Sequence, residues 1–451
     1  MKRILWFRRD LRVEDNPLLS LGGEVLPIFI FDENILKELP KDDKRVSFIF
    51  YYIIKLKSDL QKIGLDLKIF YSKHEAVFDY LKCYDEVVAC GDYDSYAKER
   101  DLHVSHKLHF RYLNDTYIFK PNEVLKDDGT SYFVFTPFYK KARAILDKKN
   151  IDKVEIAHNV LVNEDYEGIT KIGSEITKLT LDMQSIGFVA QELDIVNPHV
   201  KLENFKKNIN NYKEMRDFLD EDIGSHLSVD LRFGTISTRA VLRDMLACQS
   251  VAEAFIRQLI FRDFYAYLLF HIPTLETKNY KYGFNGIEDD EKYERFCSAT
   301  TGVPIVDAGV RELLQTGEMH NRVRMVAASF FTKDLLLPWQ WGERFFALYL
   351  LDYDKASNVL SWQWSAGTGV DPQPYFRVFN PYLQSKRFDK EARYIKKWLP
   401  ELLHVEPKYL HDEMYLLKNE LKNYPKPMVE HKEASKRAVM LFKNQIYKLL
   451  S

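Results

Sequence analysis

The chain has 451 residues, of which 46% are hydrophobic, 29% charged and 14% aromatic, and its formal net charge is −1. This length predicts two or three domains with sizeable cores, and the charge excludes a global attraction to nucleic acid, so a basic binding face would have to be local. Four scattered cysteines without C-x-x-C spacing argue against zinc, an iron–sulfur cluster or a disulfide framework, and we predict no metal site. Because no apolar run reaches membrane-spanning length and no signal-peptide pattern follows Met1, we expect a cytoplasmic protein without a membrane partner.

Residues 1–127 alternate short β-rich runs with helical patterns. The β-rich runs are Ile4–Arg8, Val25–Phe31, Leu67–Phe70, Glu86–Cys90 and Phe110–Leu113. The helical patterns between them are Val46–Ile63, His74–Lys82 and Ser95–His109. Such alternation predicts an α/β domain with a parallel, doubly wound sheet, although neither G-x-G-x-x-G nor a P-loop is present.

The pattern loosens in residues 128–204. The polar stretch Asn163–Asp194 shows no strong period, and we interpret residues 128–204 as a long connector between domains. Strand signals then almost vanish. Helical patterns follow at Ile236–Cys248, Val251–Phe270, Ile305–Gln315, Met319–Leu337, Gly342–Tyr353 and His431–Leu450. Residues 205–451 are therefore predicted to form an all-α domain.

The stretch Thr316–Trp364 mixes polar groups with large indoles in an unusual way. On a helix, Asn321, Arg324 and Met325 fall at i, i+3 and i+4 and therefore share one face. Four of the six tryptophans lie in this stretch, namely Trp339, Trp341, Trp362 and Trp364. The mixture favours a pocket for a flat aromatic ligand with polar edges; the alternative is a helical core with buried ion pairs, of which Arg324 with Asp352 is the candidate.

Two further segments carry candidate binding residues. Gly224–Ser228 offers hydroxyls and backbone N–H groups to a diphosphate, or else simply caps the following helix. Phe255, Gln258, Phe261 and Arg262 fall at i, i+3, i+6 and i+7, which is either one wall of a base-binding cavity or core with an arginine reaching solvent.

A third group of residues is basic. Arg322, Arg377, Lys386 and Arg387 form either a rim that follows phosphates or a solvated surface.

Long blocks of the sequence resemble the photolyase/cryptochrome flavoproteins, and most closely the class I cyclobutane pyrimidine dimer photolyases. The resembling blocks are ILWFRRDLRVEDNPLL, TGVPIVDAGVRELLQTGEMHNRVRMVAASFFTKDLLLPWQWGERFF, LLDYDKASNVLSWQWSAGTGVDPQPYFRVFNP and YPKPMVEHKEA. The resemblance implies an α/β domain, a long connector and a helical FAD-binding domain. It also implies light-driven repair of cyclobutane pyrimidine dimers by electron transfer from excited reduced FAD, with damaged DNA as the partner and a monomeric enzyme.

The resemblance assigns roles to individual residues. FAD would be bound by Tyr212, Ser225, Leu227, Ser228, Phe255, Arg262, Asn321, Arg324, Asp352, Asp354 and Asn358. The catalytic residues would be Asn358 facing flavin N5, and Met325, Gln258 and Trp364 at the lesion. Electron transfer would use Trp362 and Trp339, and DNA would be contacted by Phe261, Arg322, Trp364 and Arg377.

Two alternatives to dimer repair stay open on the sequence. Enzymes for (6-4) photoproducts use a histidine pair in the helix that carries Asn321, and here only His320 is present; Gln258 in place of the usual Glu keeps this alternative open. Asn358 favours an enzyme over a cryptochrome that senses blue light without repair. Glu318 stands at a usual Trp position and His226 at a usual Arg position. These two differences leave the affinity for substrate and the binding of the phosphates open.

The sequence departs from the family at the outer end of its electron chain. No tryptophan exists near Tyr282–Gly286, where a third one would fall, so we predict that photoreduction uses a tyrosine, is weaker or takes another route. The antenna chromophore is also undecided. Methenyltetrahydrofolate would need a carboxylate near Tyr93–Asp101, where Glu99 is out of register, and a deazaflavin or no antenna is equally arguable.

Overall fold

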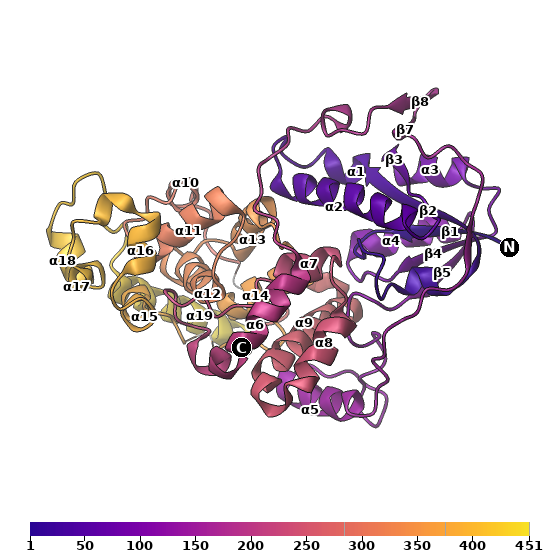
Figure 1. Cartoon of the computed structure of the whole chain (residues 1–451). Coiled ribbons are helices and arrows are strands. Elements are labelled where there is room, and N and C mark those ends of the chain that lie inside the picture. The colour runs from indigo at the N-terminus through magenta and orange to yellow at the C-terminus, as the bar shows by residue number, and fades with distance from the viewer. Residues whose placement is uncertain (284, 375, 451) are drawn as a thin grey trace. The chain divides into compact units, whose positions relative to one another are not determined.

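The chain forms two compact units in a computed structural model that describes residues 1–283, 285–374 and 376–450 (Figure 1). The first unit comprises Met1–Ser131, Pro137–Ile209 and Ser225–Phe270. The second comprises Tyr132–Thr136, Asn210–Gly224 and the chain from His271 onward. The predicted division at residues 127 and 204 stays a prediction.

One eight-stranded sheet organises the first unit. Its strands are β1 (Lys2–Phe7), β2 (Gly23–Asp32), β3 (Lys68–Ser72), β4 (Glu86–Cys90), β5 (His109–Leu113), β6 (Asn159–Leu161), β7 (Ile169–Ile172) and β8 (Ile176–Leu179). The spatial order is β5-β4-β1-β2-β3-β7-β8, with β6 paired to β2. Every pairing is parallel except β7 with β8, so the predicted parallel sheet is confirmed.

Helices connect the strands and complete the first unit. Those between the strands are α1 (Glu33–Leu36), α2 (Lys44–Gln61), α3 (His74–Tyr80) and α4 (Ser95–Ser105), followed by α5 (Phe135–Leu146), α7 (Ser228–Phe233), α8 (Thr238–Ala247) and α9 (Glu253–His271). The short turns are η1 (Pro17–Ser20), η2 (Gln184–Ile186) and η3 (Gln249–Ala252).

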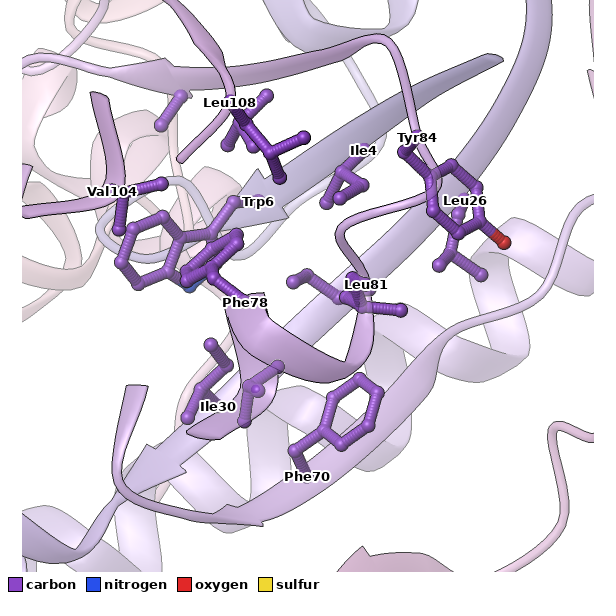
Figure 2. Packing of buried hydrophobic residues seen from close by; sticks show 14 of the residues in the cluster. Ile4, Trp6, Leu26, Ile30, Phe70, Phe78, Leu81, Tyr84, Val104 and Leu108 are labelled. Atoms are coloured by element: carbon purple, nitrogen blue, oxygen red, sulfur yellow. The ribbon is translucent and has the colours of Figure 1, made fainter. Parts of the chain in front are cut away.

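The core of the α/β part lies where α3 and α4 cover the sheet (Figure 2). Alternate residues of β1, such as Ile4 and Trp6, point to this face, as the period of two in a strand requires. The Trp6 ring meets Phe78 of α3 edge-on, with ring centroids 4.8 Å apart. This dry contact fixes α3 against the strands on which the first unit depends.

Polar residues fix the chain directly after β1. Arg12 donates from both terminal nitrogens to Asp115, over 2.9 Å and 2.6 Å, and one of them also reaches the carbonyl oxygen of Asp15. Asn16 caps η1 by accepting from the N–H of Leu18, and Pro17 begins the turn. These contacts explain why the opening block needs its arginine, its asparagine and its proline in this order.

The segment Asn163–Asp194, predicted to be unpatterned, contains β7, β8 and η2. Each of the two strands has four residues, with the sequences ITKI and ITKL, and β8 is largely exposed. Strands this short have too few residues to show an alternating pattern, so the sequence does not predict them.

The second unit is helical, as predicted. α6 (Pro198–Met215) runs from the first unit into the second. The remaining helices are α10 (Asp290–Cys297), α11 (Pro304–Thr316), α12 (Asn321–Ser329), α13 (Trp339–Tyr349), α14 (Lys355–Ala366), α15 (Pro381–Phe388), α16 (Arg393–Trp398), α17 (Pro407–Leu410), α18 (Glu413–Lys418) and α19 (His431–Leu450), with the 3₁₀ turns η4 (Pro273–Glu276) and η6 (Pro400–Leu402). Among the described residues, none of these helices combines the length and the apolar character that crossing a membrane requires.

A π-helical turn, η5 (Phe330–Asp334), continues α12 and holds two other helices. The buried ammonium group of Lys333 donates to the carbonyl oxygen of Ala366 on α14 over 2.6 Å. The same group lies 3.7 Å from the centre of the Phe442 ring on α19. Asp334 pairs with Nδ1 of His431, at the start of α19, over 2.5 Å. The wide turn thus ties α14 and α19 to the end of α12.

Candidate functional site

An arginine–carboxylate pair forms one part of the candidate site in the second unit. Arg324 of α12 donates from its two terminal nitrogens to the two oxygens of Asp352, over 3.1 Å and 3.0 Å. Its Nε donates to the carbonyl oxygen of Met319 over 2.7 Å. Both side chains are largely shielded from solvent, and the ion pair predicted from the sequence is confirmed. A guanidinium held by three hydrogen bonds presents a fixed positive charge.

Asn358, on α14, is held by Glu343, a residue that the sequence pattern does not single out. Asp354 begins this helix and accepts from the N–H of Ser357 over 3.0 Å. One turn later, Nδ2 of Asn358 donates to both the carbonyl oxygen and Oε1 of Glu343, each over 3.0 Å. Because Glu343 takes both amide hydrogens, Oδ1 of Asn358 is the atom left to accept a hydrogen bond from a ligand.

Glu343 lies on α13, 15 residues before Asn358, and no local pattern connects the two. Burial raises the pKa of Glu343, while the bonds from Asn358 and Tyr353 act in the opposite direction. The amide orientation at Asn358 is thus determined by a half-buried acid on a neighbouring helix.

The two tryptophans predicted for electron transfer are both buried. Trp362 meets Phe346 edge-on at 4.9 Å and Phe331 at 5.4 Å. No described residue accepts a hydrogen bond from its Nε1. Trp339 instead donates from its Nε1 to Oδ1 of Asn279 over 2.7 Å.

A third aromatic donor stays a prediction. The segment Tyr282–Gly286, where the resemblance would place a third tryptophan, includes Phe284, which lies outside the described residues.

Gly342 makes room for the Trp362 indole. A Cβ atom built on Gly342 would lie 2.2 Å from Cη2 of that ring. Side chains cannot approach so closely, so this helix position requires glycine.

The predicted lesion- and DNA-facing residues of the second unit have different surroundings. Asn321 is exposed, and its Nδ2 lies 3.7 Å from Sδ of half-buried Met325. The half-buried Trp364 has its ring 6.4 Å from that of Phe379. Arg377 is exposed.

Arg322 is already engaged within the second unit. Its guanidinium donates to Asp217 over 2.6 Å and stacks 4.5 Å from the centre of the Phe388 ring. Its role in DNA binding stays a prediction.

His320 caps the start of α12. Its Nδ1 accepts from the N–H of Arg322 over 3.2 Å. Burial lowers the pKa of His320 to about 4, and the charges of Arg324 and Arg322 act in the same direction against the carboxylate of Asp217. At neutral pH this imidazole is therefore uncharged and occupied by the helix end.

The predicted residues of the first unit lie on α9 and before α7. Arg262 donates to the carbonyl oxygens of Thr116 over 2.7 Å and Leu231 over 3.0 Å, so its guanidinium holds backbone. Phe255 is buried against Phe205, with ring centroids 4.6 Å apart. Gln258 and Phe261 are half-buried, one turn apart on the same helix.

The predicted phosphate residues differ in exposure. Ser228 is exposed, Ser225 is half-buried, and Leu227 is buried, so only the backbone of Leu227 can face a ligand. Leu227 rather than a serine occupies the cap position of α7, and no side chain caps this helix. Tyr212, in the second unit, is buried, and burial raises its pKa.

The polar groups of the second unit fit the edge of the expected isoalloxazine ring. Such a ring carries two carbonyl oxygens and, when reduced, N–H groups. Arg324 would offer a fixed cation to the carbonyl side, and Oδ1 of Asn358 would offer an acceptor to an N–H. Because these donors and acceptors are held by other residues rather than by solvent, they suit a bound flavin.

Comparisons with known proteins cover nearly the whole chain. A family described as DNA photolyase matches residues 3–191, and the FAD binding domain of DNA photolyase matches residues 255–444. The deoxyribodipyrimidine photo-lyase of Alkalihalophilus pseudofirmus is 35% identical over 98% of both chains. That of Halobacterium salinarum is 32% identical over the same shares.

The structure of this chain also superposes on solved photolyase structures. A class III photolyase from Agrobacterium tumefaciens superposes with a TM-score of 0.83 at 29% identity, covering 99% of this chain and 98% of the other. An archaeal photolyase from Sulfolobus tokodaii, solved with two FAD molecules, gives 0.83 at 30% identity, covering 98% of this chain and 100% of the other. The chain belongs to the DNA photolyase family.

Proposed function

We propose that this chain is a light-driven DNA repair enzyme that splits cyclobutane pyrimidine dimers with FAD as its cofactor. The observation that carries the proposal is the match with deoxyribodipyrimidine photo-lyases from end to end, at up to 35% identity among those compared. FAD, when bound, supplies the light-excited electron donor. The side chains of this protein orient the cofactor and the lesion, exclude water and supply fixed charge.

The second unit would hold the flavin ring. Arg324, fixed by Asp352, places a positive charge where negative charge develops, and its bonds leave it little freedom to reorganise. Asn358 accepts through Oδ1 because Glu343 occupies both of its amide hydrogens. Asp354 caps the start of α14 and so fixes where Asn358 lies along the helix axis.

Other residues would hold the rest of the cofactor and the lesion. Tyr212, Ser225, Leu227 and Ser228 are proposed for the phosphates, and Phe255, Arg262 and Asn321 complete the predicted FAD set. Met325, Trp364, Gln258 and Phe261 are proposed for a lesion turned out of the helix, because soft or aromatic side chains and one amide suit a stacked pyrimidine pair. Arg377 is proposed as a phosphate contact because its side chain is exposed.

The state of His320 favours the dimer over the (6-4) photoproduct. Acid catalysis needs a protonated imidazole near neutral pH, whereas burial lowers the pKa of His320 to about 4. Its Nδ1 is also taken by the helix start. No second histidine follows it in α12.

An illuminated repair assay tests the proposal. Reduced holoenzyme is given two oligonucleotides, one with a cyclobutane thymine dimer and one with a (6-4) photoproduct, in blue light and in darkness. We expect intact thymines from the dimer substrate in light only. Recovery from the (6-4) substrate alone would assign the alternative chemistry, and recovery from neither, with flavin bound, would indicate a cryptochrome-like sensor.

We also propose that the enzyme acts as a monomer in the cytoplasm. Supporting the cytoplasm, the four cysteines are all free thiols, as in proteins of reducing compartments. Light scattering after size-exclusion chromatography should give the 53.3 kDa mass of one chain. A concentration-independent mass of twice this value would contradict the monomer.

A further inference from the structure

A cavity of about 300 Å³ in the first unit lies outside every residue assigned above to FAD or DNA. It is bordered by α1, by the end of β3 and by the segment that follows η2. Three exposed lysines line it, Lys37, Lys41 and Lys73. Within the described part of the chain, neither Lys41 nor Lys73 has a carboxylate at ion-pair distance, and Lys37 lies 3.8 Å from exposed Glu38. Three ammonium groups around one hollow attract an anion, although the chain as a whole carries no positive charge.

Part of the cavity lining, called here the apolar wall, is apolar. It consists of Leu36, Tyr71 and Phe188, and Phe188 is buried. Lys41 lies over the Phe188 ring, 5.0 Å from its centre. Lys171 lies over the half-buried Tyr71 ring at the same distance. The wall therefore offers rings directly beside ammonium groups, which suits an aromatic ring attached to an anionic group.

Backbone contacts hold this wall in place, although its parts are distant in sequence. The N–H of Val189 donates to the carbonyl oxygen of Lys41 over 2.8 Å, and the N–H of Gln191 donates to Oγ of Ser47 over 2.9 Å. Gly187, with φ of +78°, turns the chain so that Phe188 enters the cavity. The segment predicted as a connector thus has a defined place, as one wall of a site.

Polar groups at the same cavity add selectivity. Glu33 and Asn34 of α1 also line it. A carboxylate and an amide can bond the hydroxyl and amino groups of a sugar or base. An inorganic anion would leave the apolar wall unused, and an uncharged aromatic compound would leave the lysines unpaired.

We propose that this cavity binds a nucleoside phosphate, with the phosphates on Lys37, Lys41 and Lys73 and the base against Tyr71 and Phe188. The site is separate from the proposed repair function and does not depend on it.

Calorimetric titration of flavin-loaded holoenzyme with ADP tests the site, because the bound flavin prevents ADP from entering the flavin site. We expect saturable binding that weakens as salt rises. Adenosine and inorganic pyrophosphate should each bind at least tenfold more weakly than ADP, because each lacks one half of the interaction. Equal affinity of pyrophosphate and ADP would overturn the nucleoside assignment, and absence of ADP binding would overturn the site.

Matched variants locate the binding. The double variant Lys41→Gln/Lys73→Gln should lower ADP affinity more than tenfold. Lys82→Gln removes the same charge from an exposed position that does not line the cavity, and it should leave affinity unchanged. Unchanged ADP affinity in the double variant would overturn the proposal.

Acylation provides a second readout that needs no substitution. ADP should protect Lys41 and Lys73, but not Lys82, from an amine-reactive reagent, as mass spectrometry measures. Equal labelling of all three lysines with and without ADP would also contradict the site.

Discussion

At the scale of single residues, Glu343 determines which atom the Asn358 amide, proposed to face the flavin, can offer to a ligand. Asn358 is 8% exposed and donates twice to Glu343. In Asn358→Asp, two carboxyl groups would face each other at that position, which favours proton uptake or separation. We expect repair turnover to fall about tenfold or more, together with a lower melting temperature.

The double variant Asn358→Asp/Glu343→Gln provides the control. The Gln amide can donate to the new carboxylate, so part of the loss should be recovered, as a double-mutant cycle on turnover and on flavin retention measures. If the two single effects simply added, the assigned contact would be wrong.

Gly342 is a second position at which a single added carbon atom should change stability. In Gly342→Ala the new Cβ would meet the Trp362 ring at 2.2 Å, and overpacking of this kind costs about 1–3 kcal/mol. Urea unfolding should show this loss, with altered indole fluorescence. Gly173→Ala is the control, because the nearest atom to its Cβ is 3.8 Å away and its backbone is unstrained. Equal stability of the two variants would contradict the close packing of Gly342 against the Trp362 ring.

His320 gives a prediction about pH. Burial holds its pKa at about 4 in the folded chain, against 6.5 ordinarily. Between these values the unfolded chain binds the proton more readily, so stability falls as pH drops from 6.5 to 4 and is unaffected by this group above 6.5. In His320→Asn, which keeps a helix cap, about 2 kcal/mol of that pH dependence should disappear in denaturant titrations at pH 7 and pH 4.5. An unchanged pH profile would contradict a buried, neutral imidazole.

At the scale of elements, Phe442 is the largest buried side chain of α19 among residues 431–444, whose side chains the structure describes. Phe442 is 2% exposed beneath the Lys333 ammonium, whereas Met440 on the same helix is 56% exposed. Phe442→Ala should cost about 3 kcal/mol and speed amide exchange in α19, and Met440→Ala should change stability by less than about 0.5 kcal/mol. Slow exchange of α19 in Phe442→Ala would show that other contacts hold this helix.

Elements with strong local patterns were predictable from the sequence. β4 has the predicted bounds Glu86–Cys90, and β1, β2, β3 and β5 lie within two residues of their predicted bounds. The strands β1 to β4 are largely buried and marked by their own apolar runs, whereas β5 is largely exposed and marked by its aromatic residues. The π-helical turn η5 was not predictable, since it lies inside one continuous helical pattern, Met319–Leu337. β7 and β8 were missed because they are short.

The candidate site was predictable only in part from the sequence. Arg324 and Asp352 were paired correctly because their residue types suggest an ion pair. Glu343 and Asn279 could not be predicted. Glu343 lies 15 residues from its partner Asn358, and Asn279 lies 60 residues from its partner Trp339, so only the tertiary structure brings each pair together.

At the scale of the whole molecule, a formal net charge of −1 limits how DNA can be attracted. Binding should rest on a few local phosphate contacts, so the slope of log K against log salt should be shallow. Arg377→Gln, at an exposed position, should reduce that slope by about one. Arg322→Gln should reduce it less, because Asp217 already compensates this charge. If Arg322→Gln reduced the slope more than Arg377→Gln does, Arg322 would have to leave Asp217 and contact DNA.

The π-helical turn at Phe330–Asp334 makes this region sensitive to chain length. An ordinary helix advances about 100° per residue, and the wide turn already accommodates one extra residue. A residue added to or deleted from the regular part of α12 would therefore rotate Lys333 and Asp334 by that angle, away from α14 and α19. Natural variation in this segment should therefore proceed by substitution at constant length, whereas the exposed loops can gain or lose residues freely.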